Sequence, residues 1–91
     1  MFNNKNLIVT GGTGSFGKAF VEYVLKNFKP RKVVIFSRDE LKQFEFANYL
    51  TKKGYNKEQF RFFIGDVRDK DRLSLAFQQM DYVIHAAALK Q

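Results

Sequence analysis

The chain has 91 residues, enough for one small domain, and its 45% hydrophobic and 27% charged residues are typical of a globular protein. It contains no cysteine, which excludes disulfides and thiolate metal sites, and we expect no bound metal. The formal net charge is +7, but the 16 lysines and arginines are scattered without a long basic run. We therefore expect a solvated basic exterior and no nucleic-acid partner, with a nucleic-acid-binding surface as the alternative.

Apolar runs alternate with helical patterns along the chain. The predicted elements, in chain order, are a strand at 6–10, a helix at 15–27, a strand at 32–37, a helix from 39 to about 53, a strand at 61–64, a helix from 70 to about 79, and a strand at 82–86. Pro30 helps to end the first helix, Gly54 stands where the second needs a C-terminal cap, and Asp69 is a suitable N-cap for the third.

Two of these helices have an apolar face that should pack on a sheet. In the helix at 15–27, the residues at helical spacing are Phe16, Ala19, Phe20, Tyr23, Val24 and Phe28. In the helix that begins at 70, they are Leu73, Ala76, Phe77 and Met80. We predict that both sets are buried.

The order β-α-β-α-β-α-β with short apolar strands predicts an α/β fold, a parallel sheet covered by helices on both faces. Right-handed crossovers and the doubly wound arrangement predict the strand order 3-2-1-4. A complete doubly wound domain would continue past the fourth strand, whereas this sequence stops at Gln91. We therefore expect residues 1–91 to form a single, partial Rossmann domain, the N-terminal piece of a longer protein.

A glycine-rich segment joins the first strand to the first helix. Its glycines are Gly11, Gly12, Gly14 and Gly17, and they fit both G-x-G-x-x-G and G-x-x-G-x-x-G. Glycines in this context let backbone amides approach a pyrophosphate, and the helix N-terminus adds a positive dipole end. Thr13 and Ser15 can add hydroxyl donors. The segment predicts a dinucleotide site; an unliganded flexible turn is the alternative.

The end of the second strand indicates which dinucleotide is bound. Ser37 and Arg38 can hold a ribose 2′-phosphate, and Lys42 lies one helical turn beyond Arg38. This favours NADP over NAD. In the alternative, Arg38 and Lys42 are surface residues, and Asp39 or Glu40 binds the ribose hydroxyl of NAD.

The turns after the third and fourth strands complete the predicted site. Asp66 can accept from the adenine amine and the Val67 backbone can meet the ring edge, although Asp66 could instead only cap a turn. After the fourth strand, the small Ala86 lets the backbone pass close to the nicotinamide side, and Lys90 would project toward a substrate phosphate. We interpret His85, the single histidine, as a packed, hydrogen-bonded residue and not a catalyst.

One further match is interpreted as coincidental. Tyr49 and Lys53 have the Tyr-x-x-x-Lys spacing of short-chain dehydrogenase catalysts. The match falls in the helix at 39–53, on the flank of the sheet, so we assign it no catalytic role.

Together these segments resemble the extended short-chain dehydrogenase/reductase superfamily. Four strings are similar, more narrowly, to the inverting UDP-N-acetylglucosamine 4,6-dehydratases, which are grouped with the polysaccharide biosynthesis proteins. The strings are TGGTGSFGK at 10–18, SRDELKQ at 37–43, FFIGDVRD at 62–69 and HAAALKQ at 85–91. The resemblance covers essentially the whole chain.

The resemblance implies a tightly held NADP that is recycled in each turnover. It further implies that the full-length protein oxidises the sugar at C4, eliminates water across C5 and C6, and returns hydride at C6 with inversion at C5, in bacterial surface-polysaccharide or flagellin-glycan synthesis. The residues implied to contact NADP are Gly11, Thr13, Gly14, Ser15, Phe16, Gly17, Ser37, Arg38, Asp39, Glu40, Leu41, Lys42, Asp66, Val67 and Ala86. Lys90 is implied to contact the nucleotide sugar.

The family's catalytic residues lie beyond the fourth strand, so we expect none within this chain, and the chain alone should be inactive. The longer protein should be a homo-oligomer. Because the glycine loop begins at residue 11, without a preceding apolar segment of roughly 20 residues, we expect a cytoplasmic protein that does not contact membranes. An epimerase of the same superfamily and a non-catalytic nucleotide-binding remnant are the alternatives.

Overall fold

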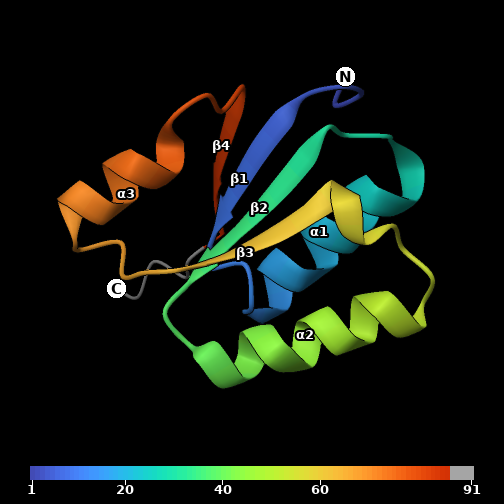
Figure 1. Ribbon diagram of the computed structural model, residues 1–91, viewed down its shortest axis with the longest axis horizontal. Helices are drawn as coiled ribbons and strands as arrows, with labels where there is room; N and C mark the ends of the chain where they lie inside the picture. Colours follow the sequence, from blue (N-terminus) through green and yellow to red (C-terminus); the bar gives the residue numbers. More distant parts are fainter. Residues whose placement is uncertain (87–91) are drawn as a thin grey trace.

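In the computed structural model, which describes residues 1–86, four parallel strands form one sheet in the order β3-β2-β1-β4 (Figure 1). The strands are β1 (Asn6–Thr10), β2 (Lys32–Ser37), β3 (Phe60–Ile64) and β4 (Tyr82–His85). Leu7 of β1 is in register with Val33 of β2 and with Tyr82 of β4. The predicted α/β fold and the strand order 3-2-1-4 are confirmed.

The helices cover both faces of this sheet. They are α1 (Ser15–Asn27), α2 (Glu40–Lys52) and α3 (Lys70–Phe77), with a short 3-10 helix, η1 (Lys57–Gln59), before β3. Figure 1 shows α1 and α2 on one side of the sheet and α3 on the other. Each helical crossover returns the chain to the end of the sheet where the previous strand began. All four strands therefore run parallel, and their carboxyl ends lie at the same end of the sheet.

Element boundaries differ from the prediction by one or two residues. Asp39 lies outside α2, because its carboxylate caps the helix by accepting from the Lys42 amide at 3.0 Å. The third helix ends at Phe77, because Gln78 is extended and Gln79 has a positive φ of 63°. Asp69 caps α3 as predicted, by accepting from the Arg72 amide.

The core has two layers, one on each face of β1 and β2. Alternate residues of a strand point to opposite faces, so Leu7 and Val9 pack with α1 and α2, whereas Ile8 packs toward α3. Val33 and Ile35 join the first layer in the same way. Burial on both faces explains why the two central strands are continuous apolar runs.

The buried face of α1 differs from the predicted one. The residues that pack on the sheet are Gly17, Val21, Val24 and Leu25. Phe16 and Tyr23 are 60% and 54% exposed, so predicting their burial was wrong. The physical reason is the contact at Gly17, where a Cβ atom would lie 2.5 Å from the Gly11 carbonyl oxygen, so that this side of the helix must face the loop.

The remaining predicted core positions are mixed. In α1, Val24 is buried, Phe20 is half-buried and Ala19 is exposed, and Phe28, directly after the helix, is half-buried. In and after α3, Ala76 is buried, and Leu73, Phe77 and Met80 are half-buried and packed against the second layer. The sheet-facing side of α3 therefore agrees with the prediction.

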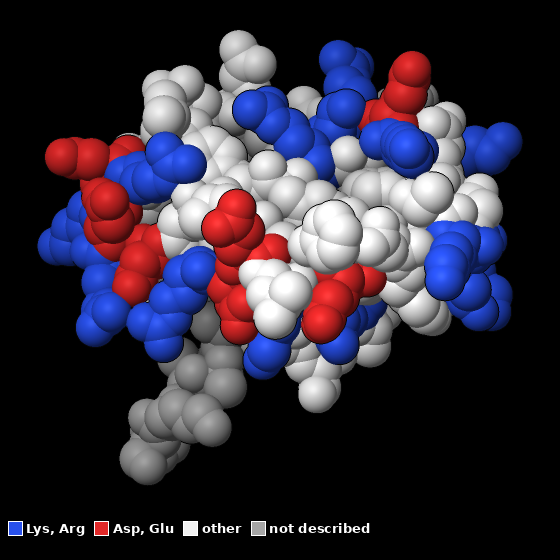
Figure 2. All heavy atoms as spheres, turned by 60° about the horizontal axis from the view of Figure 1, so that its bottom comes forward, with Lys and Arg blue, Asp and Glu red and all other residues white. Residues whose placement is uncertain are grey.

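Charged side chains are distributed over the surface. Figure 2 shows Lys and Arg mainly around the margins of one face, with Asp and Glu between them and uncharged residues in the middle. On this face the basic residues do not merge into one patch. Between residues 1 and 86, no helix has both the length and the apolar character needed to cross a membrane.

Candidate functional site

A large cavity of about 1130 Å³ lies at the carboxyl ends of the strands. Its wall comes from the glycine loop, the end of β2, the turn after β3 and the end of β4. This is where an open parallel sheet binds its ligands, because the strand order reverses there and the loops diverge. A small cavity of about 400 Å³ adjoins it between α1 and α2 and shares Thr13, Gly14, Ser15 and Lys42.

Most of the residues predicted to hold a cofactor meet at the large cavity. Those on its wall are Gly11, Thr13, Gly14, Ser15, Phe16, Ser37, Arg38, Asp39, Lys42, Asp66, Val67 and Ala86. Gly17 is buried beneath the loop, and neither Glu40 nor Leu41 is on the wall; Leu41 is 64% exposed. Lys90 lies outside the described residues.

The glycine loop is held tightly against β2. The Gly11 amide donates to the Phe36 carbonyl oxygen at 2.8 Å, and Gly11 has a positive φ of 66°, which favours glycine. Gly17 permits close contact between α1 and the loop, since a Cβ there would meet main-chain atoms at 2.5 and 2.6 Å. At Gly14 the nearest atom to such a Cβ is 3.4 Å away, so this glycine is not required by packing.

The N-terminus of α1 differs from those of the other two α-helices. Asp39 and Asp69 cap α2 and α3 with their carboxylates, whereas the N-cap of α1 is Gly14, and no side chain of residues 1–86 caps it. Its first turn contains no acidic residue. Amides and the positive dipole end of α1 are therefore available to an anion beside the large cavity.

The end of β2 carries one buried hydroxyl donor, on Ser37, and two exposed cationic donors, on Arg38 and Lys42. Ser37 is 7% exposed, and it is joined to α2 through Gln43, whose Nε2 donates to the Ser37 hydroxyl at 2.9 Å. Arg38 and Lys42 are exposed and have long, flexible side chains. Sequence reasoning missed Gln43, because a lone glutamine in an amphipathic helix carries no signal of its tertiary partner.

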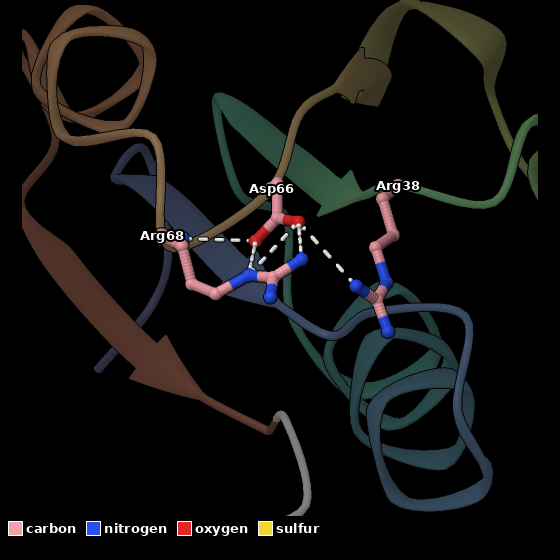
Figure 3. Close-up of polar contacts among 3 residues, drawn as sticks. All are labelled: Arg38, Asp66 and Arg68. Atoms are coloured by element: carbon pink, nitrogen blue, oxygen red, sulfur yellow. Dashed lines mark hydrogen bonds and ion pairs between the residues drawn. The ribbon is translucent and has the colours of Figure 1, made fainter.

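Asp66 lies between two guanidinium groups (Figure 3). Arg38 Nη1 approaches its Oδ2 at 3.3 Å, and Arg68 Nη2 approaches the same atom at 2.8 Å. The Arg68 amide and Nε also donate to Oδ1, at 2.9 and 3.1 Å. These hydrogen bonds, those of Arg68 first, hold the pKa of Asp66 well below its usual range, and Asp66 in turn raises the pKa of Arg68.

Arg68 was also missed at the sequence level, although a signal was present. The side chain of an arginine two residues after an aspartate in a turn can bend back and donate to that carboxylate. Here both the guanidinium and the backbone amide of Arg68 donate to Asp66. The resulting carboxylate is ionised and fixed in place on the cavity wall.

His85 is hydrogen-bonded, as predicted. Its Nδ1 lies 2.8 Å from the Thr10 hydroxyl on the neighbouring strand β1, and its ring lies 6.2 Å from that of Phe77. The His85 side chain is nevertheless exposed, and it lines the large cavity. Within residues 1–86, no three His, Asp or Glu side chains are grouped so that they could hold a metal ion.

Tyr49 and Lys53 lie away from the large cavity. The Tyr49 hydroxyl donates to Glu22 Oε1 at 2.8 Å, and Lys53 Nζ lies 5.7 Å from the centre of the Tyr49 ring. The hydrogen bond to Glu22 raises the pKa of Tyr49, which is opposite to the change that a catalytic tyrosine base needs near neutral pH. The pair therefore has a structural role between α1 and α2.

Comparisons with known proteins agree over almost the whole chain. Residues 7–91 match a family model described as "Polysaccharide biosynthesis protein". A UDP-N-acetylglucosamine 4,6-dehydratase (inverting) of Campylobacter jejuni subsp. jejuni serotype O:23/36 (strain 81-176) is 57% identical over 90 residues, which are 99% of this chain and 25% of the relative. A UDP-glucose 4-epimerase of Rickettsia bellii (strain OSU 85-389) is 48% identical over 94 residues, 100% of this chain and 26% of the relative.

Solved structures are also similar to this chain over nearly its whole length. The X-ray structure of Pen from Bacillus thuringiensis matches with a TM-score of 0.88 and 40% identity, over 99% of this chain and 27% of that one. A dTDP-glucose 4,6-dehydratase from Bacillus anthracis in complex with NAD matches with a TM-score of 0.66 over 93% of this chain and 27% of that one; at 21% identity this shows the fold alone.

The chain spans about a quarter of the length of the curated relatives it matches. The matches nevertheless extend over almost the whole of this chain, and the resemblance seen in the glycine loop and the three later strings is confirmed. This chain belongs to the polysaccharide biosynthesis protein family.

Proposed function

We propose that this chain is the NADP-binding part of a longer nucleotide-sugar 4,6-dehydratase that acts on UDP-N-acetylglucosamine. The observation that carries the proposal is the uncapped N-terminus of α1, which opens beside the same cavity as Ser37, Arg38 and Asp66. Free helix amides and a glycine loop suit a pyrophosphate, and the cations at the end of β2 suit a further phosphate. The residues present therefore fit a dinucleotide.

Three features of the β2 end support NADP over NAD. Arg38 and Lys42 both line the large cavity, and the Ser37 hydroxyl lies between strand and helix beside them. The Asp39 carboxylate, which could otherwise bind a ribose hydroxyl, already caps α2. Glu40 is not on the cavity wall. The site thus presents more donors and cations than free carboxylates to the ribose.

The proposed reaction rests on the 57% identity to the Campylobacter dehydratase. When bound, the cofactor supplies hydride acceptance and return, which accompany oxidation of the sugar at C4, loss of water across C5 and C6, and reduction at C6 with inversion at C5. The residues of this chain bind and orient the adenine half of the cofactor. Lys90 is proposed to contact the nucleotide sugar, and the catalytic groups are expected beyond residue 91.

Mass spectrometry of the product tests this reaction. The protein at its natural full length, incubated with UDP-N-acetylglucosamine, should yield a sugar nucleotide lighter by one water. The 91-residue chain alone is expected to leave the substrate unchanged, which serves as the matched control. A product of unchanged mass from the full-length protein would contradict the dehydratase assignment.

An epimerase is the second candidate, because the Rickettsia UDP-glucose 4-epimerase is 48% identical over the same segment. An epimerase shares the cofactor site but conserves the mass of the sugar. A product of equal mass and a changed proton NMR spectrum would favour this candidate. An unchanged sugar by both methods would favour a non-catalytic nucleotide-binding protein.

We also propose a cytoplasmic location, in bacterial surface-polysaccharide or flagellin-glycan synthesis, and a homo-oligomeric full-length protein. Cell fractionation and light scattering test the first and last of these. Recovery in the membrane fraction, or a monomeric mass, would contradict them.

A further inference from the structure

Gln43 is a buried amide at the point where α2 crosses the ends of β2 and β3. It is 5% exposed. Its Nε2 lies 2.9 Å from the Ser37 hydroxyl oxygen, 3.2 Å from the Ser37 carbonyl oxygen and 3.2 Å from the Phe63 carbonyl oxygen. A buried polar side chain that spans three elements in this way constrains the groups it contacts.

The orientation of this amide follows from its partners. Two of the three are main-chain carbonyl oxygens, which can only accept, so the NH₂ group and not Oε1 must face them. An amide nitrogen cannot accept a hydrogen bond. The contact at 2.9 Å is therefore a donation from Gln43 to Ser37 Oγ, with the two amide protons shared among three acceptors.

This donation determines what the Ser37 hydroxyl can do. Because Oγ accepts from Gln43, its own proton points elsewhere, and within residues 1–86 it donates to no protein group. Ser37 is held at its carbonyl as well, by the Gly65 amide at 2.9 Å. Since one lone pair of Oγ is taken by Gln43 and no protein group among the described residues accepts its proton, the serine can offer a hydroxyl donor on the wall of the large cavity.

The surroundings of that donor select its ligand. Arg38 and Lys42 line the same cavity, so a hydroxyl donor and two cations meet at the end of β2. A phosphate monoester has three oxygens that accept from such donors, whereas a ribose hydroxyl offers one weak acceptor and needs an acceptor for its own proton. A carboxylate partner would suit the hydroxyl better than this donor set does.

We propose that Gln43 is a positioning residue that fixes Ser37 as a hydrogen-bond donor and thereby makes the site selective for a 2′-phosphate. This inference rests on the proposed NADP-binding function and deepens it, because it assigns selectivity to a buried residue that should not touch the nucleotide. Gln43 acts on the nucleotide through Ser37, and its bond to the Phe63 carbonyl oxygen anchors its own side chain.

The test uses 2′,5′-ADP and 5′-AMP, which differ only in the 2′-phosphate, with isothermal titration calorimetry on the full-length protein. Gln43→Met keeps the side-chain length but removes the donor, and should weaken 2′,5′-ADP about five- to tenfold while changing 5′-AMP less than about twofold. Gln59→Met is the matched control: Gln59 also donates to a carbonyl oxygen, that of Pro30, away from the cavity. It should change neither affinity.

Gln43→Asn is a second variant in case the Met variant fails to fold. It keeps a polar amide, but its side chain is one methylene shorter and should not reach Ser37 Oγ. A double-mutant cycle then isolates the pair: Ser37→Ala should weaken 2′,5′-ADP about tenfold, and a change at Gln43 in that background should cost nothing more. Thermal melting of each variant confirms folding.

The outcomes separate the inference from the function on which it rests. Equal losses for 2′,5′-ADP and 5′-AMP, or additive losses in the Ser37→Ala background, would show a purely structural role for Gln43. If the natural protein prefers 2′,5′-ADP and Arg38→Ala removes the preference while Gln43→Met retains it, only this inference is overturned. If the natural protein shows no preference, the NADP assignment and the inference fall together.

Discussion

Arg38, directly after β2, and Asp66, after β3, form an ion pair in which Nη1 lies 3.3 Å from Oδ2 (Figure 3). Both residues line the large cavity. A carboxylate has about four lone-pair directions, and Arg38 and Arg68 together direct five contacts at them. If Arg38 turns to a 2′-phosphate, Asp66 loses one of its three contacts at Oδ2 and keeps those of Arg68, so its carboxylate stays in place on the cavity wall.

This relationship gives an asymmetric prediction for Arg38→Ala. The affinity for NADP should fall about 10- to 100-fold, because a charge-assisted hydrogen bond contributes roughly 1.5–3 kcal/mol. The affinity for NAD should change by less than about twofold, since NAD has no 2′-phosphate and Asp66 is still held by Arg68. Calorimetric titration with both dinucleotides measures the two values.

Arg31→Ala is the matched control, because Arg31 is exposed and precedes β2 at the opposite end of the sheet. It should leave both affinities unchanged. Equal losses for NADP and NAD in Arg38→Ala would contradict the assignment of Arg38 to the 2′-phosphate.

Two glycines of the loop should separate folding from binding. Gly17→Ala places a Cβ 2.5 Å from the Gly11 carbonyl oxygen, and the atoms it meets are main-chain atoms of Gly11 and Gly12, which have no flexible side chain to move aside. We expect a loss of about 1–3 kcal/mol in the free energy of unfolding, or about 4–8 °C in melting temperature per kcal/mol. Thermal and urea denaturation measure this loss.

Gly14→Ala should show the opposite behaviour. Its nearest neighbour would be at 3.4 Å and its φ is −77°, so alanine fits without strain. The added methyl group lies at the N-cap beside the cavity, where it should weaken both dinucleotides about tenfold. A Gly14→Ala protein that melts several degrees lower, or binds normally, would overturn this division of roles.

Asp66→Asn should weaken NADP and NAD by similar factors, about five- to tenfold, because adenine is common to both. Asp71→Asn, an exposed aspartate of α3, is the control. Because its arginine partners lower the pKa of Asp66, the carboxylate stays ionised down to acidic pH. Its contribution should be constant from about pH 5 to about pH 8 and be lost only as pH falls through the lowered value. A selective loss of NADP would place Asp66 at the 2′-phosphate instead.

Glu22 on α1 accepts hydrogen bonds from the Tyr49 and Tyr55 hydroxyls at 2.8 and 2.9 Å. The free energy of unfolding should therefore depend on pH in the alkaline range, where tyrosines lose their protons. The Glu22 hydrogen bond raises the pKa of Tyr49, and desolvation followed by Glu22 raises that of Tyr55. A raised pKa in the folded state gives a stabilisation that is present below about pH 10 and is lost as pH rises through the folded value.

The urea midpoint should therefore fall above about pH 10 in the natural chain, and the fall should be shallower in Tyr49→Phe. Tyr23→Phe changes an exposed tyrosine of the same helix as Glu22 and serves as the control. The same slope in both variants would show that the Glu22 hydrogen bonds do not contribute.

Much of the fold could be read from local patterns. The apolar runs of β1 and β2 are continuous because both faces of these strands are covered, and the glycines mark the turn into α1. The order of strands followed from the handedness of crossovers, which is a general rule and needs no information on particular contacts. Asp69 as a helix cap is likewise a local property, since the carboxylate and the amide it accepts from are three residues apart.

The sequence by itself thus determined the element order, the parallel sheet and the group of residues at the carboxyl edge, because each depends on near neighbours in the chain. Only the tertiary structure decided which side of α1 is buried, that Gln43 holds Ser37, and that Arg38 and Arg68 share Asp66. The contacts of Gln43 with Phe63 and of Arg38 with Asp66 join residues 20 and 28 positions apart. Such contacts depend on how helices and strands pack, and periodicity in one segment carries no information about the segment that it will meet.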